Sequence, residues 1–106
     1  MDGFRNLEDH SAILTLRELA DRITCGIIIS TIDSAKTVSQ ICDENKLPLS
    51  SIYKKIQRLH KIGVISIETI NIDHKGKKVA FYRSKIKSLE FSLTKKGIAL
   101  ELNKAS

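Results

Sequence analysis

The chain has 106 residues, enough for one hydrophobic core but too few for a core and a separate catalytic domain. Its apolar content of 42% is typical of a folded protein in water, and no apolar run approaches the roughly 20 residues that span a bilayer. The formal net charge of +6 favours a polyanionic partner. The opening stretch MDGFRNLEDH lacks the basic-then-apolar order of a secretion signal, so we expect a cytoplasmic protein with no membrane partner.

The charge is divided unequally along the chain. Residues 1–45 hold four basic and eight acidic residues, a balance of −4, whereas residues 46–106 hold fourteen basic and four acidic ones, a balance of +10. Two stretches, residues 45–67 and 74–89, contain no acidic residue. A solvated lysine-rich face explains one such stretch. Two of them favour a polyanion, because phosphate neutralisation needs cations gathered on one side.

The first half of the chain has the apolar spacing of helices. The stretch LRELADRITCGIIIST, residues 16–31, repeats apolar residues at three- and four-residue intervals. We expect a helix that is broken near Ala20, with Asp21 as the N-cap of its second part. Its longest apolar run, CGIII, is expected to be buried core. Thr37 is the expected N-cap of a second, short helix that ends near Asn45.

The stretch LPLSSIYKKIQRLHKIG predicts the third helix. Pro48 disfavours helical geometry in the residue before it, so we expect Ser50 to cap a helix that starts at Ser51. Gly63 stands where a left-handed C-terminal cap is needed. One side of this helix is apolar, and the opposite side is polar and cationic. The outer residues are Ser50, Ser51, Lys54, Gln57, Arg58 and Lys61, with Tyr53 at a flank.

The second half changes to the two-residue period of strands. Residues 64–86 predict a hairpin whose tip, DHKGKK, carries three lysines around Gly76. Residues 88–103 predict a second hairpin around the turn TKKG. An alternative for residues 95–103 is a terminal helix capped by Thr94, but the alternation of apolar and polar residues favours a strand.

The elements follow one another in the order of a winged helix-turn-helix. We therefore expect an α+β fold with a three-helix core, a β-hairpin wing and an additional C-terminal β-hairpin. Residues 13–103 make up this domain, between a flexible N-terminus at 1–12 and a tail at 104–106. A polar, cationic third helix fits the DNA major groove, and the wing lysines would reach the backbone or the minor groove.

The stretch LADRITCGIIISTIDSAKTVSQICDENKLPLSSIYKKIQRLHKIGVISIE resembles the archaeal branch of the ArsR-type winged-helix transcription regulators. YRSKIKSLEFSLTKKGIALEL is similar to the strand pair that follows the wing in some of them, so the resemblance covers about residues 16–102. It implies a dimer that reads a two-fold operator. The groove-facing positions that it implies are Ser51, Tyr53, Lys54 and Arg58. Metal-sensing members carry a Cys-x-Cys pair where this chain has Thr37 and Ser39, so metal sensing is not carried over.

We expect no enzyme, cofactor or metal site. His10, His60 and His74 have no partner at acid-base or metal-ligand spacing, and the glycines form no phosphate loop. Cys25 and Cys42 are too far apart for a metal knuckle, and we interpret them as small buried hydrophobic side chains. No small-molecule effector is evident.

The sequence thus predicts a sequence-specific regulator of transcription that binds double-stranded DNA as a homodimer. The expected DNA-binding residues are Thr37, Ser39, Ser50, Ser51, Tyr53, Lys54, Gln57, Arg58, Lys75, Lys77 and Lys78. Two alternatives use the same fold: a non-specific architectural DNA-binding protein and a winged-helix protein-interaction module. The N-terminal helix, residues 13–19, is the first expected dimer interface. The terminal hairpin is the second, because an uncovered strand edge invites pairing.

Overall fold

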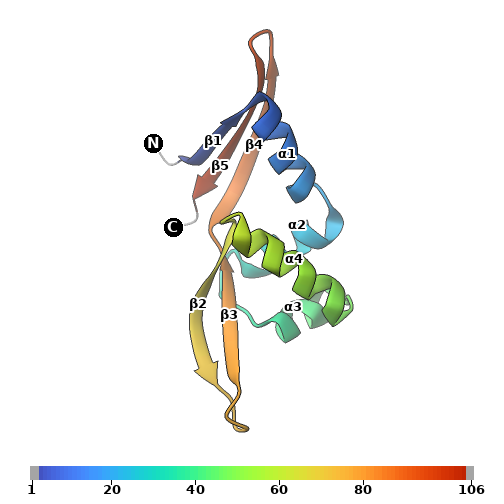
Figure 1. Ribbon diagram of the computed structural model, residues 1–106, viewed down its shortest axis with the longest axis vertical. Helices are drawn as coiled ribbons and strands as arrows, with labels where there is room; N and C mark the ends of the chain where they lie inside the picture. Colours follow the sequence, from blue (N-terminus) through green and yellow to red (C-terminus); the bar gives the residue numbers. More distant parts are fainter. Residues whose placement is uncertain (1–2, 105–106) are drawn as a thin grey trace.

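The computed structural model describes residues 3–104, and within them the fold is α+β with four helices and antiparallel sheets. The helices are α1 (Asp9–Leu19), α2 (Arg22–Thr31), α3 (Val38–Asn45) and α4 (Leu49–Lys61). The strands are β1 (Gly3–Glu8), β2 (Ile65–Ile72), β3 (Lys78–Ser84), β4 (Ile86–Thr94) and β5 (Gly97–Lys104). The molecule measures 57 × 28 × 20 Å, with the helices beside its middle and a hairpin at each end (Figure 1). None of the four helices is long and apolar enough to cross a membrane.

The helix boundaries at α2 and α3 follow the predicted caps. The side chain of Asp21 accepts a hydrogen bond of 2.7 Å from the amide of Thr24, so the break between the first two helices is confirmed. At α3, the hydroxyl of Thr37 accepts from the amide of Gln40 at 3.1 Å, and the Gln40 side chain accepts from the amide of Thr37 at 2.9 Å. This reciprocal pair satisfies two amides that the helix itself leaves free.

The third predicted helix, α4, begins two residues earlier than expected. It starts at Leu49 instead of Ser51, its N-cap is Pro48, and no side chain caps it, so the assignment of Ser50 as N-cap is wrong. Pro48 has the extended backbone of a cap residue, with φ −62° and ψ 145°, and the helix can follow it directly. At the other end Gly63 has φ +83°, the left-handed geometry that was predicted.

One hydrophobic core joins the helices to the bases of the strands. Its buried members are Ala12, Leu19, Ile27, Ile41, Ile52, Ile56, Leu59, Val64, Ile65, Ile86, Leu100 and Leu102. Every helix contributes to it. Of the apolar stripe expected on the third helix, Ile52, Ile56 and Leu59 are buried and Ile62 is half-buried.

The run CGIII is only partly buried, which corrects two predictions. Ile27 is fully buried, but Ile29 is 70% exposed. Cys25 is also exposed, and Cys42 is half-buried. A helix can bury one side only, and the side that α2 turns inward carries Thr24 and Ile27. Part of the run therefore lies on the surface.

The strands form two antiparallel sheets that share no strand. β2 pairs with β3, and the second sheet has the order β1-β5-β4. The C-terminal hairpin is thereby confirmed, and the alternative of a terminal helix is wrong. β3 leads into β4 through the buried residues Ser84 and Ile86, where the Ser84 hydroxyl donates to the Ile86 carbonyl at 2.6 Å. From this junction the hairpins extend in opposite directions (Figure 1).

The described part of the N-terminus, which the sequence predicts to be flexible, contains regular secondary structure. Residues 3–12 contain β1, which pairs with β5, and the first turn of α1, where Ala12 is fully buried. The pairing with β5 joins this terminal segment to the sheet. In the expected tail, Lys104 is the last residue of β5. Residues 1–2 and 105–106 of these two predictions lie outside the described residues.

Candidate nucleic-acid interface

Polar and cationic side chains cover the side of α4 that points away from the core. Ile52, Ile56 and Leu59 are buried on the inner side. The predicted outer residues lie opposite them: Ser50, Tyr53, Lys54, Gln57, Arg58 and Lys61 are exposed, and Ser51 is half-buried. Because α4 contains no acidic residue, this outer face presents positive charge and hydrogen-bonding groups to solvent.

Two cations of α4 are tied to neighbouring helices. Lys55 Nζ lies 2.7 Å from Asp21 Oδ2, and Arg58 Nη1 lies 3.6 Å from Glu18 Oε1. Burial alone would raise the pKa of Asp21, but hydrogen bonds from Lys55 and Thr24 outweigh it and hold that pKa below its ordinary value. Lys55 therefore braces α4 against α2. Arg58 is only loosely paired, and 64% of its side chain is exposed.

Two other lysines of the outer face, Lys54 and Lys61, are not tied to a neighbouring helix in this way. Lys54 and Lys61 form no ion pair with any residue from 3 to 104. Lys54 also lines a shallow hollow of about 220 Å³ between α2 and α4, together with Ser51 and Arg58. The Lys54 and Lys61 side chains can therefore turn toward a ligand without breaking an ion pair between helices.

The two predicted residues of α3 have different surroundings. Thr37 is half-buried, and its hydroxyl takes part in the capping box with Gln40. Ser39 is exposed in the first turn of the helix. Thr37 therefore has a structural role, whereas Ser39 has its hydroxyl in solvent.

The β2–β3 hairpin ends in a turn that presents lysines outward. The Asp73 carboxylate accepts hydrogen bonds of 2.9 Å from the amides of Lys75 and Lys77. Gly76 has φ +79°, which residues with a side chain rarely adopt. Lys75, Lys77 and Lys78 are exposed and have no ion-pair partner in the described part of the chain. The one carboxylate of the tip is thus used to shape the turn.

This hairpin is fixed to α4 and to the segment before α3. The His60 ring of α4 meets the Tyr82 ring of β3 edge-on, with centroids 6.4 Å apart and planes at 81°. The backbone of Tyr82 exchanges two hydrogen bonds with that of Lys36, of 2.8 and 2.9 Å. Burial, with a smaller contribution from Tyr53, raises the pKa of Tyr82. The predicted recognition helix and wing are therefore held at one fixed orientation.

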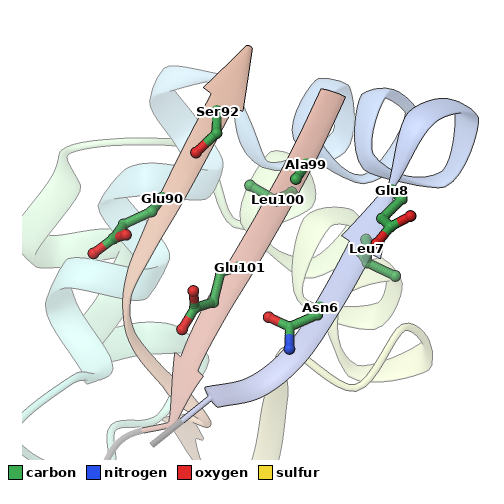
Figure 2. A pocket seen from close by; sticks show the side chains of 8 residues that line it. All are labelled: Asn6, Leu7, Glu8, Glu90, Ser92, Ala99, Leu100 and Glu101. Atoms are coloured by element: carbon green, nitrogen blue, oxygen red, sulfur yellow. The ribbon is translucent and has the colours of Figure 1, made fainter. Parts of the chain in front are cut away.

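The other end of the molecule has the opposite charge on its outer face. Figure 2 shows Glu8, Glu90 and Glu101 on three neighbouring strands, next to Asn6 and Ser92. They line a shallow hollow of about 230 Å³, and Glu90 lies directly opposite Glu101 across the β4–β5 pair. A face with such carboxylates repels a phosphate backbone. Sequence reasoning missed it, because only the pairing of β1 with β5 brings Glu8 to the other two.

No protein-family model matches this sequence, and a search of curated proteins gives no match. The candidate site therefore rests on the geometry above. Within residues 3–104, no group of three or more His, Cys, Asp or Glu side chains could hold a metal ion. What the outer face of α4 and the hairpin tip offer is positive charge, amide and hydroxyl hydrogen bonds, and one exposed tyrosine.

Proposed function

We propose that this protein is a winged helix-turn-helix protein that binds double-stranded DNA sequence-specifically and regulates transcription as a homodimer. In this proposal α3, the three-residue turn at 46–48 and α4 form the helix-turn-helix, and the β2–β3 hairpin is the wing. One observation carries it. The acid-free outer face of α4 and the lysine-bearing tip belong to elements that the contact between His60 and Tyr82 fixes to each other.

The two parts of this surface suit different contacts with DNA. On α4, Lys54, Gln57 and Arg58 stand on a regular helix, whose width fits the major groove, and can donate hydrogen bonds to base edges. The wing lysines stand on a turn and have long flexible side chains, which follow phosphates well but are poorly fixed for reading bases. The proposal therefore assigns specificity to α4 and general affinity to the wing.

The proposed dimer is supported by the small number of base pairs that one subunit can contact. A single recognition helix covers too few base pairs for useful specificity in a genome, and proteins of this kind commonly pair across a two-fold axis that matches their half-sites. The acidic face of the β1-β5-β4 sheet is suited to lie away from the DNA, at the end of each subunit that is free for other contacts.

Selection of bound sequences from a random duplex pool tests the proposal. We expect enrichment of a two-fold symmetric sequence whose half-sites are about 10 base pairs apart, or a multiple of that spacing. The matched control is a variant with Lys95→Ala and Lys96→Ala, which removes two exposed lysines from the opposite hairpin tip and should enrich the same sequence. Binding without enrichment would instead support the architectural alternative. Absence of binding would contradict both DNA-binding functions and favour a protein-interaction module.

A further inference from the structure

Among residues 3–104, the edge of the three-stranded sheet at β4 is open. In the order β1-β5-β4, the one described strand that pairs with β4 is β5. The amide of Ile98 on β5 donates to Asp9 Oδ1 at 3.3 Å, so it points toward β1 and away from β4. Leu93 of β4 lies opposite Ile98. This pair is therefore a non-hydrogen-bonded pair of the β4–β5 ladder. By the alternation of an antiparallel strand, the amides and carbonyls of Leu89, Phe91 and Leu93 point to the open edge.

The same three residues carry apolar side chains that the subunit leaves exposed. Leu89 and Phe91 are exposed, and Leu93 is 71% exposed. Beside Leu89, an apolar hollow of about 190 Å³ reaches the exposed Ile29 of α2. Native proteins commonly protect an edge strand with charges, proline or a bulge. In β4 such features lie at the start of the strand, where Lys87 falls within a register irregularity between Ile86 and Ser88. Along the following residues 88–93 the edge has one charged residue, Glu90, and no proline.

We propose that this edge is the dimer interface, and that β4 pairs with β4 of a second copy across a two-fold axis at Phe91. The inference rests on the homodimer of the proposed function and names its contact surface. A second copy fits because antiparallel self-pairing brings the outward amides and carbonyls of Leu89, Phe91 and Leu93 against the same three residues. The two sheets of three strands then become one continuous sheet.

Charge and strand length select the register of this pair. With the axis at Phe91, Leu89 lies opposite Leu93 of the second copy and Glu90 lies opposite Ser92. With the axis at Glu90, two Glu90 carboxylates would face each other at the closer spacing of a non-hydrogen-bonded pair, which is unfavourable. With the axis at Ser92, Leu89 would face the hairpin turn instead of a strand. The Phe91 register pairs all three apolar residues and separates the carboxylates.

Sedimentation of the full chain without DNA tests the interface. We expect a dimer at micromolar concentration. Phe91→Lys sets two like charges against each other at the axis and should raise the dissociation constant by about tenfold or more. Ser92→Lys sets a cation opposite Glu90 of the second copy and should tighten the dimer, whereas the matched Ser92→Glu should weaken it. A monomeric wild type, or an unchanged dimer in all three variants, would overturn the proposal.

Cysteine cross-linking tests the register without a charge in the apolar edge. Under a mild oxidant, Phe91→Cys should form a disulfide-linked dimer, because the expected Cα separation of about 5.5 Å lies within disulfide range. Leu93→Cys alone should form no disulfide-linked dimer, because Leu93 does not lie opposite itself in this register. A mixture of Leu93→Cys and Leu89→Cys should form one, because Leu89 lies opposite Leu93 of the second copy. The wild type controls for Cys25 and Cys42. Equal self-linking of Leu93→Cys would contradict the register. Cross-linking as expected in a protein that binds no duplex would support the interface while contradicting the proposed function.

Discussion

The two hairpins of this molecule are built alike but have different surroundings. Both extend from the buried junction of Ser84 and Ile86, and each tip carries lysines beside a glycine with positive φ, Gly76 in one and Gly97 in the other. The β2–β3 hairpin is fixed to the cationic helix α4. The β4–β5 hairpin packs on α1 with one face and belongs to a sheet whose other face is acidic. Under the proposed function, lysines at a tip serve DNA binding only where a cationic helix lies beside them, so the neighbouring elements distinguish the two hairpins.

The largest expected effect comes from a change in the hydrophobic core. Ile56 of α4 is buried in this core, so Ile56→Ala should lower the free energy of unfolding by about 2 to 5 kcal/mol. Ile70 of the β2–β3 hairpin is 55% exposed, and the matched change Ile70→Ala should stay within about 0.5 kcal/mol. Urea unfolding measures both. Equal losses would mean that the hairpin is as much part of the core as α4 is.

The second prediction compares the two tips directly. Replacing Lys75, Lys77 and Lys78 by Ala should weaken binding to every duplex by a similar factor. It should also make the slope of log affinity against log salt shallower by up to about 3, since each lost phosphate contact removes roughly 0.9. Replacing Lys95 and Lys96 should leave the slope unchanged. Duplex titrations at several salt concentrations give these values, and equal changes from both variants would remove the distinction between the ends.

The third prediction concerns two neighbouring lysines of α4. Lys54→Ala should weaken binding to the selected sequence by about 1 to 3 kcal/mol if Lys54 reads a base, with nearly unchanged stability. Lys55→Ala is the matched control. It leaves Asp21 without its ion pair, so it should lower stability while base preference remains. Affinities for the selected and a scrambled duplex, with unfolding curves, separate the two roles. An unchanged affinity of Lys54→Ala would contradict its placement in the groove.

The smallest expected effect is the pH dependence of the Asp21–Lys55 pair. The pKa of Asp21 is lowered in the folded protein, so its contribution to stability is present above the unfolded pKa of about 3.9 and is lost as the pH falls through the folded pKa. Asp21→Asn should therefore show a shallower fall of stability below about pH 4. Partial exposure keeps the effect modest. Parallel curves for wild type and variant would contradict the cause given for the lowered pKa.

Local features of this fold could be predicted from the sequence. The caps at Asp21 and Thr37, the left-handed Gly63 and both hairpins depend on residues a few positions apart, and the structure confirms them. The buried side of α4 was also predictable, because a helix repeats its apolar residues at a fixed period. The start of α4 lies two residues before the expected one, because Pro48 takes the cap position without a side-chain hydrogen bond.

Features that depend on contacts between residues far apart in the sequence could not be predicted from local patterns. Lys55 meets Asp21 across 34 positions of sequence, and no local pattern indicates which of the lysines of α4 finds a partner. The N-terminal strand pairs with the last strand, and this pairing creates the acidic face. The exposure of Cys25 and Ile29 likewise depends on which side of α2 the core covers. The candidate site was more accessible to sequence reasoning because most of it lies on one helix and one turn.

Amide chemical shifts recorded while the selected duplex is added test the central claim most directly. We predict changes along residues 49–61 and 73–78, the proposed recognition helix and wing tip, and none at Glu8, Glu90 and Glu101 on the acidic face. Changes confined to the β1-β5-β4 sheet, or no changes with any duplex, would contradict it.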